Sequence, residues 1–170
     1  MNQENEIKAI IDCYTDLSKQ YSAIIENLSE TELNKIPFAG SWTAAELINH
    51  ISRANNHEAF LAPGETVNRD IGENIPELKS NFLNFDIKMD SPDFLIPESR
   101  KHSKKESLDA IQNAFKNLSE HVPQCQLNQS LSGILGDLTK WELANFIVFH
   151  SQRHLKQLQN IEKSLKSNDN

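Results

Sequence analysis

The stretch Trp141–Ile161, WELANFIVFHSQRHLKQLQNI, constrains the fold more than any other part of the chain. At about 100° per residue, its apolar residues fall on one side of an α-helix. They are Leu143, Phe146, Ile147, Leu158 and Ile161. His150 and His154 lie in the middle of the same stripe. Because an amphipathic helix buries its apolar side, the stretch predicts a core helix with two imidazoles where core packing should be.

Two imidazoles in an apolar stripe need a partner, because buried polar groups are nearly always hydrogen-bonded or bound to something. Spaced at i and i+4, His150 and His154 lie one turn apart on one face and can reach a single metal ion. Alternatively, one ring bonds a backbone carbonyl and the other turns toward solvent. The spacing of the pair alone leaves both interpretations open.

Length and charge limit the organisation of the chain and its partners. A single domain over residues 1–170 is the simplest arrangement, with a polar tail from about 164 to 170 that is expected to fray. The net charge of −7 argues against a nucleic-acid or anionic-membrane partner, since both need a basic surface. No apolar run reaches the ~18 to 20 residues of a membrane span. The first residues also lack the features of a signal peptide, so we expect a cytoplasmic protein.

Three further stretches have the same amphipathic pattern. The sequence predicts helices over Asn5–Asn27, from Thr43 toward Phe60 and over Lys104–Glu120. Strand signals are weak throughout, so Val122–Leu138 is expected to be a loop. With the helix at Trp141–Ile161, four amphipathic helices predict an all-α fold, a four-helix bundle.

Capping residues mark where these helices begin. Thr43 is followed three residues later by Glu46, and Thr139 by Glu142, which is the pattern of a capping box. Ser103 is the expected cap of the third helix. The second and fourth helices are therefore predicted to start at these threonines.

A long segment, Leu61–Ser103, connects the second and third helices. Its prolines and glycines exclude a single regular element, and it is too long for a structureless connection in a compact domain. Pro76–Phe85 is predicted to form a short helix with Pro76 in its first turn. We expect the later hydrophobic residues, Met89, Phe94, Leu95 and Ile96, to pin the segment across the bundle, where any part over a pocket would act as a lid.

His50, in the predicted second helix, adds a third candidate ligand. Two histidines from one helix and one from a facing helix can close three corners of a tetrahedron, or one face of an octahedron, and leave other positions open. Alternatively, His50 simply flanks the apolar stripe of its helix. His57 lies on nearly the same side but about 10 Å further along, so it is expected to contact a pocket or solvent and not the metal.

These residues resemble the motifs of the DinB-like (YfiT-like) superfamily. In that family a Trp-initiated second helix ends its second turn with His, and the last helix contributes H-x-x-x-H. Here SWTAAELINH at Ser41–His50 is followed about a hundred residues later by HSQRH at His150–His154. The resemblance spans most of the chain and implies a four-helix bundle with a long crossover between helices 2 and 3. It also implies a divalent metal, nickel or zinc with iron or manganese as alternatives, bound by His50, His150 and His154.

The resemblance also suggests a chemistry, since members of the family include thiol S-transferases that use bacillithiol, mycothiol or glutathione, and a maleylpyruvate isomerase. Ser151 stands where a zinc protease places its general-base Glu, which argues against peptide hydrolysis by that route. Metal coordination deprotonates a thiol without a base. The favoured function is therefore transfer of a low-molecular-weight, bacillithiol-type thiol onto small electrophiles. The alternatives are a hydrolase or isomerase using metal-bound water, or a non-catalytic helical stress or interaction module.

Four other residues are candidates for the pocket or for support of the ligands: Trp42, Glu46, His57 and Arg153. Capping is the stronger role for Glu46. Arg153 lies about 100° round the helix from His154, so we expect it to face a neighbouring element or solvent, with contact to an anionic thiol as the alternative. Trp42 is expected to pack on the adjoining helix or line the pocket mouth. The expected partner is a small-molecule substrate, and a homodimer stays open because no heptad run marks one.

Overall fold

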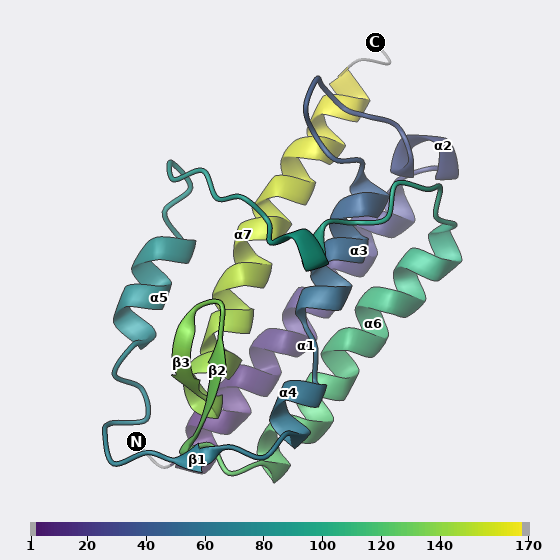
Figure 1. The fold of residues 1–170 in the computed structure, drawn as a ribbon. Coiled ribbons are helices and arrows are strands. Elements are labelled where there is room, and N and C mark those ends of the chain that lie inside the picture. The colour runs from purple at the N-terminus through teal and green to yellow at the C-terminus, as the bar shows by residue number, and fades with distance from the viewer. Residues whose placement is uncertain (1–2, 168–170) are drawn as a thin grey trace.

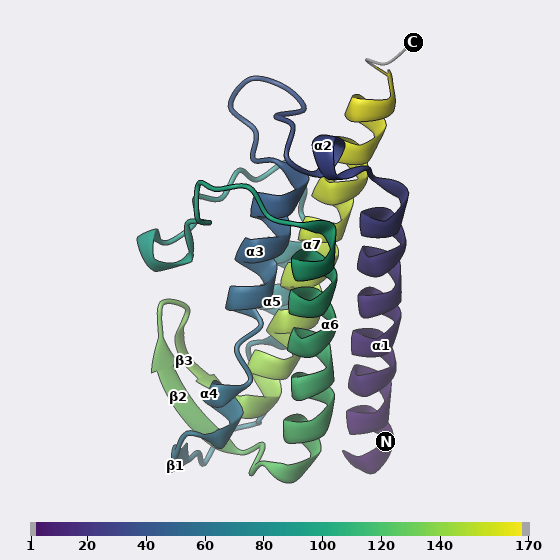
Figure 2. The ribbon, with the colours of Figure 1, turned by 90° about the vertical axis from the view of Figure 1, so that its right-hand side faces the viewer.

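A computed structural model of the chain describes residues 3–167 and is mainly helical (Figure 1). Four helices form a bundle: α1 (Gln3–Asn27), α3 (Ala44–Ala54), α6 (Lys104–His121) and α7 (Lys140–Ser167). Helices α1 and α3 each pack against both α6 and α7, and Figure 2 shows the four running side by side. The structure confirms the predicted all-α fold, a four-helix bundle with a long crossover between its second and third helices.

The bundle core depends on large buried side chains from α1 and α6. Tyr14 and Tyr21 of α1 are fully buried. Their hydroxyls donate to the main-chain carbonyls of Ala144 and Ser151 in α7 at 2.9 and 2.8 Å. The ring of Phe115 in α6 lies 6.1 Å from each tyrosine ring, centroid to centroid. Because both buried hydroxyls have acceptors, the tyrosines join three helices without an unsatisfied polar group.

The predicted capping boxes are present. The Thr43 hydroxyl accepts a hydrogen bond from the N–H of Glu46 at 3.1 Å, and the Glu46 carboxylate accepts the Thr43 N–H at 2.8 Å. Thr139 and Glu142 make the same pair of bonds at 3.0 and 2.8 Å. Ser103 caps α6 in the same way. A further capping box begins the short helix α2 (Glu30–Leu33), which lies beyond the predicted end of the first helix.

The helix predicted from Thr43 toward Phe60 is interrupted after Ala54. Asn55 caps the end of α3, and a separate helix, α4 (Glu58–Leu61), has His57 at its N-cap. The side-chain amide of Asn55 is buried and donates to the hydroxyl of Ser151 at 3.3 Å. This contact holds Asn55 at the break. The prediction that His57 continues the face of His50 along one helix was therefore wrong.

A small antiparallel sheet occupies part of the segment that was expected to be a loop. Strands β2 (Gln129–Gly133) and β3 (Gly136–Thr139) form a hairpin, and β1 (Glu65–Thr66) pairs with β2. Gly136 has a φ of 82°, which a residue with a side chain rarely adopts. A Cβ at Gly64 would lie 2.5 Å from the carbonyl oxygen of Ser130, so the close approach of these strands needs glycine there.

The crossover from α3 to α6 contains α4, β1, the helix α5 (Ile75–Phe82) and the 3-10 turn η1 (Asp93–Leu95). Helix α5 has Pro76 in its first turn, as predicted, and packs against α7. It ends before Phe85. Four residues were predicted to pin the crossover. Met89, Phe94 and Ile96 are 37%, 60% and 50% exposed, so the prediction was wrong for these three, whereas Leu95 is half-buried. Hydrogen bonds from Arg53 and Arg153 to its main-chain carbonyls help to hold the crossover in place.

A partly buried ion pair fixes the first half of the crossover. Glu142, in the first turn of α7, is fully buried and accepts hydrogen bonds from both terminal nitrogens of Arg69 at 2.6 and 2.7 Å. The main-chain N–H groups of Asn74 and Thr139 also donate to it, each at 2.8 Å. Burial acts to raise the pKa of Glu142, but these donors outweigh it and the pKa is lowered. The carboxylate therefore stays charged inside the protein.

The last helix extends into the tail that was expected to fray, and fraying itself stays a prediction. Helix α7 continues to Ser167 and buries Leu165, within the tail expected to fray from about 164, while residues 168–170 lie outside the described part. Within residues 3–167, no helix has the length and apolar character needed to cross a membrane.

Candidate metal centre

The three predicted ligands come together between α3 and α7. The Nε2 atoms of His150 and His154 are 3.1 Å apart, and one ring nitrogen from each of His50, His150 and His154 lies within 4.8 Å of the others. Two nitrogens bound to one zinc ion at 2.0–2.1 Å in a tetrahedron lie about 3.3 Å apart. The α7 pair already has this spacing. His50 would need to approach by up to about 1.5 Å, a movement within reach of side-chain rotation.

Hydrogen bonds orient two of the three rings. Nδ1 of His50 lies 2.9 Å from the carbonyl oxygen of Leu95 in η1. Nδ1 of His154 lies 2.9 Å from the amide oxygen of Gln157. Since both oxygens only accept, each Nδ1 carries the proton and each Nε2 keeps its lone pair. Ligand histidines usually donate their other N–H in this way, so both rings are prepared to bind a metal through Nε2.

His150 is held by packing. Its Nδ1 is buried without a hydrogen-bond partner among the described residues. Phe146, one turn earlier on α7, stacks on the ring at 5.3 Å between centroids, and Phe82 of α5 meets it edge-on at 6.0 Å. On the other side of the site, Trp42 lies 5.1 Å from the ring of His50. Aromatic side chains therefore flank His50 and His150.

Burial keeps the cluster neutral. Desolvation lowers the pKa of His154 to about 4, with the charge of His50 as the next cause. Desolvation also lowers the pKa of His150 well below its usual range and lowers that of His50, which are only 9% and 2% exposed. At neutral pH none of the three rings therefore carries the second proton of an imidazolium, and in His50 and His154 the one proton is on Nδ1, which leaves Nε2 free for a metal. In the part of the chain that is described, this group contains histidines alone.

The other predicted site residues have different surroundings. Trp42 packs against the ring of His50 in the adjoining helix α3. Glu46 serves the capping box. His57 packs on the ring of His121 at 4.8 Å, at the start of α4. Arg153 faces a neighbouring element: its guanidinium donates to the carbonyl oxygens of Phe82, Asn84 and Ile87 in the crossover.

Some residues around the site were not predicted. Gln157 stands three residues after His154, a spacing at which side chains on a helix meet, so this contact had a signal in the sequence. The carbonyl of Leu95, the nearby Ser91 hydroxyl at 3.5 Å from Nδ1 of His50 and the ring of Phe82 had none, because the path of the crossover places them.

Ser151, at the position of a zinc protease's general base, faces the bundle interior. It is fully buried, and its hydroxyl contacts Asn55. Its carbonyl oxygen accepts the hydrogen bond from Tyr21. The side chain next to His150 is thus committed to the core and not to the metal centre.

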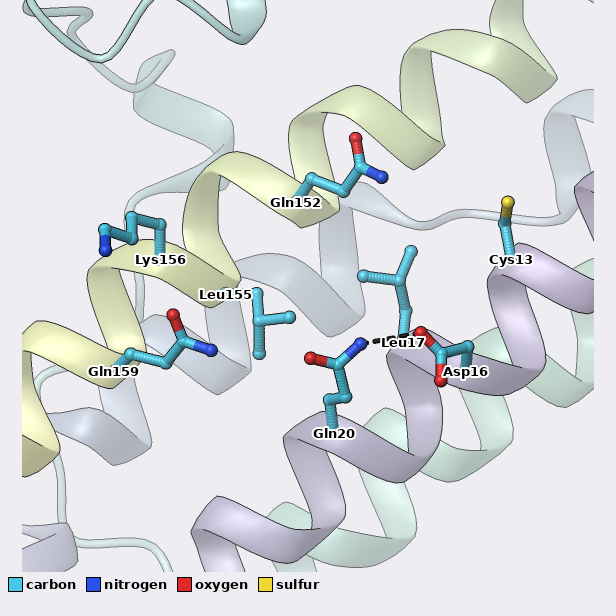
Figure 3. Close-up of a pocket in the computed structure, with 8 residues that line it drawn as sticks. All are labelled: Cys13, Asp16, Leu17, Gln20, Gln152, Leu155, Lys156 and Gln159. Carbon is cyan, nitrogen blue, oxygen red and sulfur yellow. Dashed lines mark hydrogen bonds between the residues drawn. The ribbon is translucent and has the colours of Figure 1, made fainter.

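A separate pocket of about 160 Å³ lies between α1 and α7 (Figure 3). It is lined by Cys13, Asp16, Leu17, Gln20, Gln152, Leu155, Lys156 and Gln159. Gln152 and Lys156 are each two residues from His154, which places them about 160° away around the helix axis. The pocket is therefore on the other side of α7 and includes none of the three histidines.

Comparison with known proteins adds a family and a fold. A model of the DinB superfamily matches residues 14–158, a range that includes all three histidines. Among solved structures, YfiT from Bacillus subtilis superposes with a TM-score of 0.64 at 12% identity, covering 96% of this chain and 89% of that one. YfiT is described as a probable metal-dependent hydrolase with an unusual four-helix bundle topology. No curated protein matched the sequence.

Proposed function

Because the chain belongs to the DinB superfamily, we propose that it is a divalent-metal-dependent enzyme whose ligands are His50, His150 and His154. The observation that carries the proposal is the convergence of three neutral imidazoles, those of His50 and His150 buried and that of His154 half-buried, two of them oriented with Nε2 unprotonated. A set of imidazoles suits zinc and nickel, with iron as an alternative, better than it suits manganese. A divalent cation in this site would act as a Lewis acid that lowers the pKa of a thiol or water at its open position.

We place thiol transfer first among the reactions. Three neutral ligands leave the charge of a divalent cation uncompensated, which favours an anionic fourth ligand such as the thiolate of a small thiol. The position of a zinc protease's general-base Glu holds Ser151, which is buried in the core, so this position supplies no general base. The aromatic side chains of Trp42, Phe82 and Phe146 provide an apolar wall suited to a small electrophile. The proposed activity is S-transfer from a bacillithiol-type thiol.

Metal-dependent hydrolysis is the second candidate. It is supported by the structural likeness to YfiT, which is described as a probable metal-dependent hydrolase. In that case water takes the position proposed for the thiol, and the same aromatic wall binds the substrate. Isomerisation would use the same open position. The three reactions differ in one simple requirement, since only S-transfer consumes a thiol.

Metal binding is tested first. Protein prepared with a chelator is titrated with zinc and with nickel, and the variants His150→Ala and His154→Ala are compared with wild type. His57→Ala is the matched control, because it removes a histidine outside the cluster. We expect one metal ion per chain in wild type and control and a large loss of affinity in both ligand variants. Equal binding by wild type and His150→Ala would overturn the ligand assignment, and a non-catalytic helical module would then be favoured.

Activity is tested on the metal-loaded protein. Thiol consumption is measured with bacillithiol, glutathione and cysteine against a panel of aryl halides and epoxides, and ester and amide hydrolysis is measured without thiol. Turnover that needs both metal and thiol supports S-transfer. Metal-dependent turnover without thiol would replace it with hydrolysis.

A further inference from the structure

Three consecutive carbonyl groups of the crossover accept hydrogen bonds from α3. Arg53 donates through one terminal nitrogen to the carbonyl of Phe94 at 2.5 Å and through the other to that of Ile96 at 3.0 Å. Between them, the carbonyl of Leu95 accepts the Nδ1 proton of His50 at 2.9 Å. His50 and Arg53 are three residues apart on α3, so their side chains are neighbours on one helix face. The guanidinium therefore holds the main chain on both sides of the Leu95 carbonyl, which is the hydrogen-bond acceptor of a candidate metal ligand.

Besides the bonds from Arg53 and His50, the half-buried Leu95, the buried Pro97 and a 3.4 Å hydrogen bond from the N–H of Glu98 to Asn49 of α3 hold this part of the crossover. The side chains of Phe94 and Ile96 are 60% and 50% exposed, so they contribute little packing. The bonds of η1 itself, from the N–H of Leu95 to Pro92 and from that of Ile96 to Asp93, are local to the turn. A segment with few buried apolar contacts opens easily unless other interactions hold it. The bonds from Arg53 are the ones that attach the carbonyls on both sides of Leu95 to α3.

We propose that Arg53 is a positioning residue for His50. By holding the main chain on both sides of Leu95, it keeps the carbonyl oxygen where it accepts from Nδ1, so that Nε2 stays unprotonated and directed into the site. The consequence for metal binding rests on the proposed function, whereas the effect on the His50 ring does not. Without the two hydrogen bonds from Arg53, the Leu95 carbonyl is free to move and His50 exchanges between its two neutral tautomers.

Charge and position predict opposite results when Arg53 is replaced. The guanidinium carries a positive charge near the site, so removing that charge alone should strengthen the binding of a divalent cation. Removing the two hydrogen bonds from Arg53 should weaken the binding of the cation, because His50 loses its orientation. Loss of a group that orients a ligand histidine costs roughly 10–100-fold in metal affinity. Since Arg53 acts through the Leu95 carbonyl, we expect about 10-fold, at the lower end of that range.

The test measures zinc affinity by competition with a chelating dye for wild type, Arg53→Gln and Arg53→Lys. The lysine keeps the charge but lacks the two-pronged geometry. Both variants should bind zinc about 10-fold more weakly. Arg100→Gln is the control: it removes the same charge from the crossover, and the guanidinium of Arg100 pairs with Glu98 and Glu106. It should bind zinc as wild type does or slightly more tightly. Wild-type or tighter binding by both Arg53 variants would overturn the proposal.

A metal-free measurement separates this inference from the proposed function. In chelator-treated protein, the ¹⁵N chemical shifts of the imidazole nitrogens report the tautomer of His50. We expect Nδ1–H in wild type and Arg100→Gln and a mixture of tautomers in Arg53→Gln and Arg53→Lys. If wild type fails to bind zinc, the proposed function fails, and the tautomer of the Arg53 variants still decides the role of Arg53. If Arg53→Gln does not fold, Arg53→Lys supplies both measurements.

Discussion

Acid should destabilise the metal-free protein through its buried imidazoles. Burial lowers the pKa of His154 to about 4 in the folded chain, while an unfolded chain leaves it near ~6.5. Between these values the unfolded state binds more protons, so the free energy of unfolding rises with pH. The stability that neutral His154 contributes is therefore complete above about pH 6.5 and is lost as the pH falls toward 4.

The size of the effect follows from the shift. A change from 6.5 to about 4 at about 1.4 kcal/mol per pH unit gives about 3 kcal/mol for His154. The pKa of His150 moves in the same direction for the same reason. Between pH 6 and 5 His154 alone should give a slope near one proton, or about 1.4 kcal/mol per pH unit, and His150 adds to the slope in the same direction. Carboxylates contribute little in this window because they are mostly ionised in both states.

Urea unfolding with a chelator, repeated at half-unit steps from pH 5.0 to 6.5, measures this slope. In His154→Gln the slope should fall by about one proton, or about 1.4 kcal/mol per pH unit. Lys156→Gln, on the other side of α7, should keep the wild-type slope. An unchanged slope in His154→Gln would refute the conclusion that His154 is buried in its neutral form.

Three further outcomes are expected. Arg69→Met should lower the free energy of unfolding in urea by about 3 kcal/mol, because it leaves the buried carboxylate of Glu142 without its cation. The double variant Arg69→Met, Glu142→Gln should recover part of this loss, and an Arg69→Met protein as stable as wild type would contradict the role of the pair. Zinc at about 100 times its dissociation constant should raise the melting temperature of wild type by about 5–10 °C, since binding adds about 2.7 kcal/mol to the free energy of unfolding. The melting temperature of His150→Ala should not rise in this way, and an equal rise would show that His150 is not a ligand. Arg153→Gln removes the hydrogen bonds to the carbonyls of Phe82, Asn84 and Ile87. Limited proteolysis should therefore cut residues 82–96 faster in this variant than in wild type, and equal rates would show that other contacts hold the segment.

Much of the fold could be predicted from the sequence because the patterns that indicate it involve residues close together in the chain. The apolar spacing within each helix and the capping boxes at Thr43 and Thr139 depend on residues within four positions of one another, and the structure confirms them. The pairing of His150 with His154 follows from the same helical geometry. His50 became a candidate because it lies in the predicted second helix, where flanking the apolar stripe was the alternative. The resemblance to the DinB-like superfamily, to which the chain belongs, then implied that it is a ligand.

The failures share a different cause. The break at Asn55 depends on a hydrogen bond to Ser151, far away in the sequence. The hairpin of β2 and β3 is short, and β1 completes the sheet from a segment more than sixty residues earlier. Neither feature leaves a repeating pattern within its own stretch. Exposed Phe94 and Ile96 show the same limit, since hydrophobic character alone predicted burial there.

The sequence by itself determined the approximate positions of the four bundle helices, where three of them begin and which face of the last helix carries two imidazoles. Tertiary structure alone decided how the site is assembled. The proton on His50 is directed by a carbonyl 45 residues away, which Arg53 holds in place. The physical reason is that helix periodicity and capping are local interactions, whereas a ligand's orientation depends on a contact across the bundle that exists only after the crossover has folded over it.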